Sequence, residues 1–337
     1  MSSVKQEHYV PRCYLKNFEN KNKRIYAFDK RLGVCRKQMI TNVAAENHFY
    51  DVDINEFVNI DGLDPLERED LKIKLMNNLN AKSWEEAVAR FDRQYMEKRM
   101  SAMEFNFEQF LKKIIDNLKS GNVISLSDEE KKEMSLYIAI QYQRTRTIRN
   151  NFEDIIMGTI NALVKKESSF KGQIMLENES YILVKKYIKC LHLMMMSDGI
   201  TIKEIADTLY NHVWTFHINK TNIPFYTSDS PVVSIPHCFN PYMSCSGLES
   251  PGIEVVFPIS TNLLLSMYDE NDEQNQNRID KSTDFITKEE DIKFYNNYQL
   301  YYSNRCVFSI SDDFEAIEEL FNKYPELKER KPHITVY

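Results

Sequence analysis

Polar and apolar residues alternate along the first part of the chain. Residues 24–28 follow the period of two that a half-buried β-strand requires. Residues 34–40 can return as the hairpin partner of that strand after a turn at Gly33. Residues 47–52 are expected to form a third strand. We therefore expect a small β-rich unit over residues 1–60.

The pattern changes to a helical period over residues 64–212. Asp64 followed by Pro65 is a typical helix start. Ser127 and Glu130 form a capping box, in which each side chain can bond a backbone amide at the start of a helix over residues 129–150. Further helices are expected over residues 151–166, 179–197 and 202–211. The central region is therefore expected to be helical.

Strand-like segments return over residues 213–337, together with two helix starts near Thr287 and Asp312. The order of elements is β, then α, then mixed β and α. Such segregation predicts an α+β fold rather than an alternating parallel sheet. We expect the two β regions to pair into one sheet with the helices packed on a face, and residues 1–337 to form a single interlocked domain.

The composition narrows the class of protein. Hydrophobic residues make up 42 % and charged residues 28 % of the chain, which excludes a disordered or fibrous protein. No apolar run approaches the roughly eighteen residues that span a membrane. The first residues also lack the apolar stretch of a signal peptide. We therefore expect a globular, cytoplasmic protein without a membrane partner.

The net charge of −7 is unevenly distributed. Residues 1–40 contain ten Lys or Arg and three acids, so this segment carries +7 and the remainder −14. Clustered cations release counterions when they bind a polyanion, and the basic segment could therefore contact nucleic acid or another phosphate-bearing ligand. The alternative is a solvated rim that pairs with the acidic remainder of the same fold.

The chain lacks the glycine-rich phosphate loops and the Cys and His spacings of common zinc sites. Individual polar residues among apolar neighbours are the remaining candidates. His8 precedes Pro11 in the basic segment, and an imidazole with a pKa of about 6.5 can act as a general acid or base. Alternatively, it fixes the N-terminal turn by bonding a backbone carbonyl. Glu46 would share a strand face with His48, although a lone Glu in such a position is usually exposed.

The helix expected over residues 129–150 carries two polar residues that could serve a site. Gln141 and Arg144 lie three positions apart, so both can point toward the same cleft. The planar guanidinium of Arg144 suits a phosphate or a carboxylate. The alternative is a buried Arg144 that is paired with an acid such as Glu46 or Asp229.

A short polar turn at residues 227–231 separates two apolar segments. It places Asp229 at the end of a strand, next to Ser228. A carboxylate there can ligate a metal ion, or it can cap backbone amides in an Asx turn.

Several motifs occur in a fixed order along the chain. They are His8-Tyr-Val-Pro11-x-x-Tyr14-Leu15-x-x-Phe18, Glu46-x-x-Phe49-Tyr50, Gln141-x-x-Arg144-Thr145, Trp214, Thr227-Ser228-Asp229-x-Pro231, Phe257-Pro258-Ile259-Ser260 and Asn297. Because these motifs occur in this order, the chain resembles the prokaryotic domain-of-unknown-function family 4238 from His8 to about Ser303. The resemblance implies an intracellular prokaryotic protein with one continuous domain, and it brings no established activity.

Two functions from different classes fit these residues. The first is a hydrolase that acts on phosphodiester bonds in nucleic acid or a nucleotide. His8 would be its acid or base, and Glu46 and Asp229 would hold a divalent metal ion or orient water. The substrate would be bound by Arg12, Gln141, Arg144 and Ser228. By analogy with other uncharacterised bacterial proteins, such a hydrolase could serve as a toxin or in phage defence.

The alternative is a non-catalytic binding or protein-interaction module. In that case the same residues form a buried polar network that locks the β regions to the helices. The basic N-terminal face would then contact an acidic partner or RNA.

Overall fold

The computed structural model describes residues 6–59, 64–91, 95–121, 124–167, 178–197, 199–238, 245–275 and 277–329. Helices and strands are segregated along the chain, which confirms the expected α+β fold. Strands of the described residues form three sheets of two, four and five strands.

The N-terminal region contains short strands that pair in two ways. Its elements are β1 (Gln6–His8), α1 (Arg12–Leu15), β2 (Ile25–Asp29), β3 (Val34–Gln38) and β4 (Ala45–Asn47). Strands β2 and β3 form the expected antiparallel hairpin, whereas β1 pairs with β4. The strand expected over residues 47–52 is wrong. Strand β4 ends at Asn47 because His48 adopts a left-handed backbone, with φ of 54°, that interrupts extended structure.

The central region is helical, as expected. Its helices are α2 (Ile54–Val58), α3 (Pro65–Asn78), α4 (Trp84–Arg90), α5 (Tyr95–Lys119), α6 (Asp128–Gln143), α7 (Arg146–Glu167), α8 (Asn178–Ser197) and α9 (Gly199–Asn211). The capping box of Ser127 and Glu130 begins α6. None of the helices in the described residues is both long and apolar enough to cross a membrane.

The helix expected over residues 129–150 is broken in two. Arg144 is the C-cap of α6, and α7 begins at Arg146. Between them, Oγ1 of Thr145 accepts a hydrogen bond from the backbone N–H of Ile148 at 3.4 Å, which satisfies an amide at the start of the second helix. At this break Arg144 bonds Glu104 and the carbonyl of His8, whereas Thr145 bonds within the junction itself.

The C-terminal region contributes strands to two sheets. Its elements are β5 (Val213–Asn219), β6 (Thr227–Ser228), β7 (Val233–Pro236), β8 (Ile253–Ser260), β9 (Leu263–Tyr268), β10 (Ser282–Ile286), α10 (Glu289–Tyr302), β11 (Cys306–Ser309) and α11 (Glu315–Lys323). One sheet has the order β10-β5-β9-β8-β7, and the other has the order β3-β2-β11-β6. The two β regions therefore pair through β2 and β11, but most C-terminal strands form a sheet of their own.

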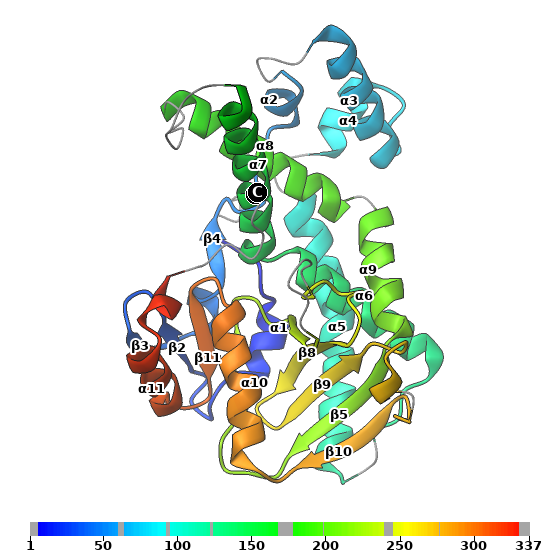
Figure 1. The fold of residues 1–337 in the computed structure, drawn as a ribbon. Coiled ribbons are helices and arrows are strands. Elements are labelled where there is room, and N and C mark those ends of the chain that lie inside the picture. Colours follow the sequence, from blue (N-terminus) through cyan, green and yellow to red (C-terminus); the bar gives the residue numbers. More distant parts are fainter. Residues whose placement is uncertain are drawn as a thin grey trace.

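The five-stranded sheet is covered on both faces. Val255 and Phe257 of β8 belong to the main hydrophobic core with α5, α6 and α9, whereas Val256 packs toward Ile292 of α10. In Figure 1, α10 lies between β11 and this sheet, and α6 and α9 lie above the sheet. Because both faces are buried, all eight residues of β8 are buried, and its sequence is a nearly continuous apolar run.

One hydrophobic core contains residues from all three regions, including Tyr14, Ile138, Phe257 and Phe308. Helices α2, α3 and α4 pack separately, in a cluster that also includes Cys190 of α8. In Figure 1 these three helices lie at the end of the molecule that is farthest from the five-stranded sheet. Strands β1 and β4 and the α6–α7 junction lie between the two ends.

Candidate functional site

Arg144 lies at the α6–α7 junction with only 2 % of its surface exposed. Its Nε donates to the hydroxyl of Tyr50 at 3.2 Å, Nη1 to Glu104 at 2.9 Å, and Nη2 to the backbone carbonyl of His8 at 2.6 Å. Burial lowers the pKa of the guanidinium, but Tyr50 and Glu104 outweigh this effect and hold the pKa above its ordinary value. Arg144 therefore joins β1, the segment after β4, and α5.

His8 and Gln141 lie next to this arginine network. Nε2 of Gln141 donates to the carbonyl of Tyr9 at 3.3 Å, and its buried Oε1 has no hydrogen-bond partner among the described residues. The ring of His8 bonds the carbonyl of Ile40, while its buried Nε2 has no hydrogen-bond partner in the part of the chain that the structure describes. Burial, followed by the nearby charge of Arg12, lowers the pKa of His8. The imidazole is therefore neutral at pH 7.

Asp229 is buried, and both of its carboxylate oxygens accept hydrogen bonds from the backbone. The amides of Asn304, Arg305 and Cys306 donate to them at 2.8, 2.8 and 2.9 Å. Burial raises the pKa of Asp229, whereas the three amides and the charge of Lys30 act in the opposite direction. This is the geometry of backbone capping. In the part of the chain that the structure describes, no group of three or more His, Cys, Asp or Glu is arranged to hold a metal ion.

Ser228 is also held by internal hydrogen bonds. Its hydroxyl donates to Oε1 of Gln299 at 2.8 Å and accepts from the amide of Ser230 at 3.1 Å. The preceding Thr227 bonds the hydroxyl of Tyr14 at 2.7 Å, and that hydroxyl also bonds the carbonyl of Pro258 at 2.7 Å. The segment at residues 227–231 thus connects α1, β8 and α10.

Glu46 and Arg12 lie nearer the surface. Glu46 faces Glu7 across the β1–β4 pair and forms an ion pair of 3.2 Å with Arg146 at the start of α7. Arg12 is exposed on α1. The structure therefore brings together His8, Gln141 and Arg144, places Glu46 beside Arg146, and uses Asp229 and Ser228 in a separate network.

Glu7 has no exposed surface, although no pattern in the sequence marks it as a candidate. Its Oε2 accepts a hydrogen bond from the amide of Tyr50 at 2.6 Å, and its carboxyl group is within hydrogen-bonding reach of Asp51. Asp51 in turn bonds Nδ1 of His48 at 2.6 Å. Burial raises the pKa of Glu7 to about 7, and the neighbouring carboxylate adds to this effect. The surroundings of Glu7 therefore favour its protonated form.

A pocket of about 360 Å³ lies beside the first turns of α7, and we call it the α7 pocket. None of the described residues that line it is Asp, Glu, Lys, Arg or His. Its polar wall consists largely of hydroxyl groups from Thr145, Thr147, Ser230, Ser234, Ser246 and Ser250. Tyr142 and Tyr302 contribute aromatic rings. The hydroxyls of Thr147 and Ser230 bond one another between α7 and the β6–β7 connection.

A known protein family matches most of the chain. The model of a family described as protein of unknown function, DUF4238, matches residues 6–313. The chain belongs to the DUF4238 family. The match includes every motif segment from β1 to α10 and confirms the resemblance seen in the sequence. No curated protein and no solved structure matches the chain.

Two motif segments of the DUF4238 protein supply residues to both a buried network and the α7 pocket. Arg144 is held in the network at β1, while the following Thr145 lines the pocket. Asp229 caps the segment at residues 304–306, while the following Ser230 lines the same pocket. His8, Glu46 and Asp229 do not line it.

Proposed function

We propose that the DUF4238 protein is a non-catalytic binding module, and that its ligand is an uncharged, hydroxyl-rich molecule in the α7 pocket. One observation carries the proposal: two motif segments, far apart in the sequence, supply Thr145 and Ser230 to one pocket, and none of its described lining residues is charged. The buried neighbours Arg144 and Asp229 act as the framework that holds these two residues in place.

The lining of the α7 pocket favours a neutral ligand. A charged group loses much solvation on burial and needs a charged partner, which this wall does not provide. Hydroxyl groups both donate and accept hydrogen bonds, so they match the hydroxyls of a sugar or nucleoside. The aromatic rings of Tyr142 and Tyr302 offer apolar contact. The volume of about 360 Å³ lies at the lower end of the range for small-molecule sites.

The hydrogen bonds of Arg144 and Asp229 also support a framework role for these two side chains. All donor nitrogens of Arg144 and both carboxylate oxygens of Asp229 are already engaged within the chain. A group that is saturated by internal hydrogen bonds has little capacity left for substrate or a metal ion.

Thr147→Val should weaken ligand binding by about tenfold, because it removes one hydroxyl from the pocket and keeps the side-chain shape. The test is thermal unfolding and calorimetry of the full chain with a panel of nucleosides and monosaccharides. A ligand at a hundred times its Kd stabilises the folded protein by about 2.7 kcal/mol.

Thr159→Val is the matched control, since Thr159 lies on the same helix outside the α7 pocket and its exposed hydroxyl donates to the carbonyl of Ile155 at 2.8 Å. This variant should bind like the wild type. The proposal fails if no compound in the panel binds, or if Thr147→Val and Thr159→Val bind a compound equally well.

A hydrolase that acts on phosphodiester bonds is the second candidate, and β1 is the feature that favours it. His8 is a neutral base with an unpartnered Nε2, and the exposed Arg12 nearby could bind a phosphate. Glu7 is an acid with a pKa of about 7. However, successive residues of a strand point to opposite faces, so Glu7 and His8 cannot act on one substrate from the same side. We rank the hydrolase second for this reason.

Glu7→Gln should make the protein more stable above pH 7. The folded pKa of about 7 lies above the ordinary value of 4.5, so the folded state holds the proton more tightly. The stability that this proton confers is complete below pH 4.5 and is lost as the pH rises through 7. The amide mimics the protonated acid, and the expected gain at pH 8 is about 3 kcal/mol.

Urea unfolding between pH 4 and pH 9 measures this effect, with Glu46→Gln on the opposite strand as the control. The control should change stability little, because its ion pair with Arg146 is partly exposed. The same proteins are assayed with bis(p-nitrophenyl) phosphate. If the wild type cleaves this substrate and His8→Gln does not, the result would support the hydrolase and contradict the non-catalytic binding module.

A further inference from the structure

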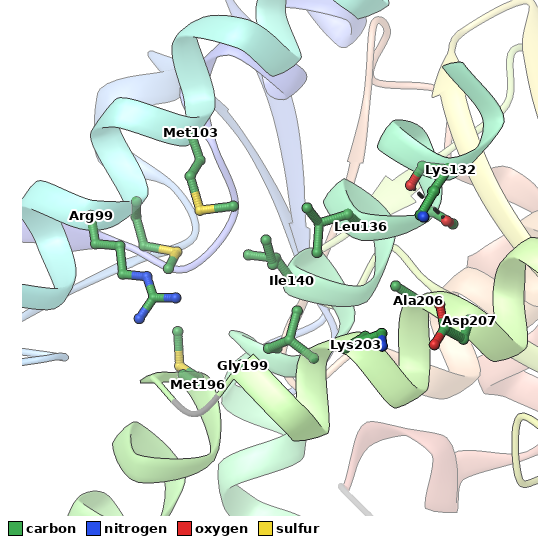
Figure 2. Close-up of a pocket in the computed structure, with 13 residues that line it drawn as sticks. Arg99, Met103, Lys132, Leu136, Ile140, Met196, Gly199, Lys203, Ala206 and Asp207 are labelled. Atoms are coloured by element: carbon green, nitrogen blue, oxygen red, sulfur yellow. Dashed lines mark hydrogen bonds between the residues drawn. The ribbon is translucent and has the colours of Figure 1, made fainter. Parts of the chain in front are cut away.

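A second pocket, of about 330 Å³, lies between α5, α6 and α9, and we call it the α5–α9 pocket. Its floor is apolar. Figure 2 shows Met103 of α5, Ile140 of α6 and Met196 at the end of α8 directed toward one space. Methionine side chains are flexible and adapt to apolar ligands of varied shape. The pocket shares no lining residue with the α7 pocket, so it is a separate site.

Cationic side chains surround this apolar floor. Arg99 lies at one side of the space in Figure 2, and Lys132 and Lys203 lie at the other. Among the described residues that line the pocket, Asp207 is the one acid. Among the described residues, the three cations form no ion pair with a carboxylate, and Arg99 donates to the carbonyl of Ser197 at 3.0 Å. The rim is therefore able to bind an external anion.

We propose that the α5–α9 pocket binds a medium-chain fatty acid, with the alkyl chain on the methionine-rich floor and the carboxylate at the cationic rim. The charge of the rim favours an anionic head group over a neutral lipid. An apolar cavity of about 150 Å³ accommodates benzene, so a cavity of twice that volume suits a chain of roughly twelve carbons. This site is independent of the ligand in the α7 pocket.

Calorimetry of the full chain with saturated fatty acids of increasing length, each below its micellar concentration, tests the proposal. Each methylene group that enters the pocket should lower Kd by about fourfold. The gain should stop near twelve carbons, when the cavity is full. Decan-1-ol should bind at least about tenfold more weakly than decanoate, because it lacks the charge that pairs with the rim.

The double variant Lys132→Gln/Lys203→Gln separates the rim from the floor. Both side chains are exposed, so the variant should fold normally. It should bind decanoate about tenfold more weakly and leave decan-1-ol unchanged. Lys112→Gln, on an exposed position of α5 outside the pocket, is the control and should bind decanoate like the wild type.

A third variant tests the floor itself. Ala206→Phe, which fills the pocket from α9, should abolish binding of both decanoate and decan-1-ol.

The proposal is overturned if decanoate gives no saturable heat, if decan-1-ol binds as tightly as decanoate, or if the double lysine variant binds decanoate as tightly as the wild type does. Binding of an apolar acidic peptide in the absence of decanoate binding would also overturn it.

Discussion

Asp229→Ala is expected to lower the free energy of unfolding by about 4 kcal/mol, which is a large share of the stability of an ordinary domain. The buried carboxylate accepts hydrogen bonds from three consecutive amides, at Asn304, Arg305 and Cys306. Alanine leaves these donors without an acceptor, and each unsatisfied buried donor costs about 1–3 kcal/mol. Urea unfolding followed by circular dichroism measures the loss.

Two further variants define the cause of this loss. Asp229→Asn keeps one carbonyl oxygen for the amides, so it should lose less stability than Asp229→Ala. Asp312→Ala, at an exposed position, should remain within about 0.5 kcal/mol of the wild type. A loss below about 1 kcal/mol for Asp229→Ala would contradict the capping role and make the carboxylate available for ligand chemistry.

Arg144→Ala should lower the free energy of unfolding by about 3–5 kcal/mol, which is the range for removal of one partner from a buried ion pair. The variant loses the bonds to Glu104, to the hydroxyl of Tyr50 and to the carbonyl of His8. The carbonyl of His8 in β1 would then lose its link through Arg144 to Glu104 of α5. Thermal and urea unfolding of the purified chain provide the measurement.

Arg146→Ala is the matched control, two residues further along the chain. Its ion pair with Glu46 is 3.2 Å long, with 30 % and 40 % of the two side chains exposed. A pair with this exposure contributes about 1 kcal/mol or less. Similar losses for the two arginine variants would show that Arg144 has no special role in holding β1.

The sequence allowed a shared inward direction of Gln141 and Arg144 to be predicted, because the two residues lie three positions apart in a helical pattern. Their partners could not be predicted. Gln141 bonds the carbonyl of Tyr9, and Arg144 pairs with Glu104 of α5, a residue that no local pattern connects with it. The identity of a partner depends on how helices pack, and spacing along one helix carries no information about its neighbour.

The segregation of strand and helix patterns along the sequence predicted the fold class correctly. It did not predict which residues near the N-terminus share a face or are buried. Glu46 and His48 share a face only if the strand continues, and it ends at Asn47 with a left-handed residue. Glu7 stands in a polar run that is typical of an exposed segment. Its burial results from pairing of β1 with β4 and from packing of Tyr50, which are long-range contacts.

The pairing of β2 with β11 also affects how this chain folds during synthesis. The side chains of Asp29 and Arg305, which join the two strands, are 276 positions apart. At about 5–20 residues per second, a ribosome needs roughly 15–60 s to translate the intervening residues. During that interval the edge of β2 opposite β3 has no strand to pair with, and unpaired edges promote aggregation. The basic residues of the N-terminal hairpin, such as Arg36 and Lys37, would repel neighbouring nascent chains during this time.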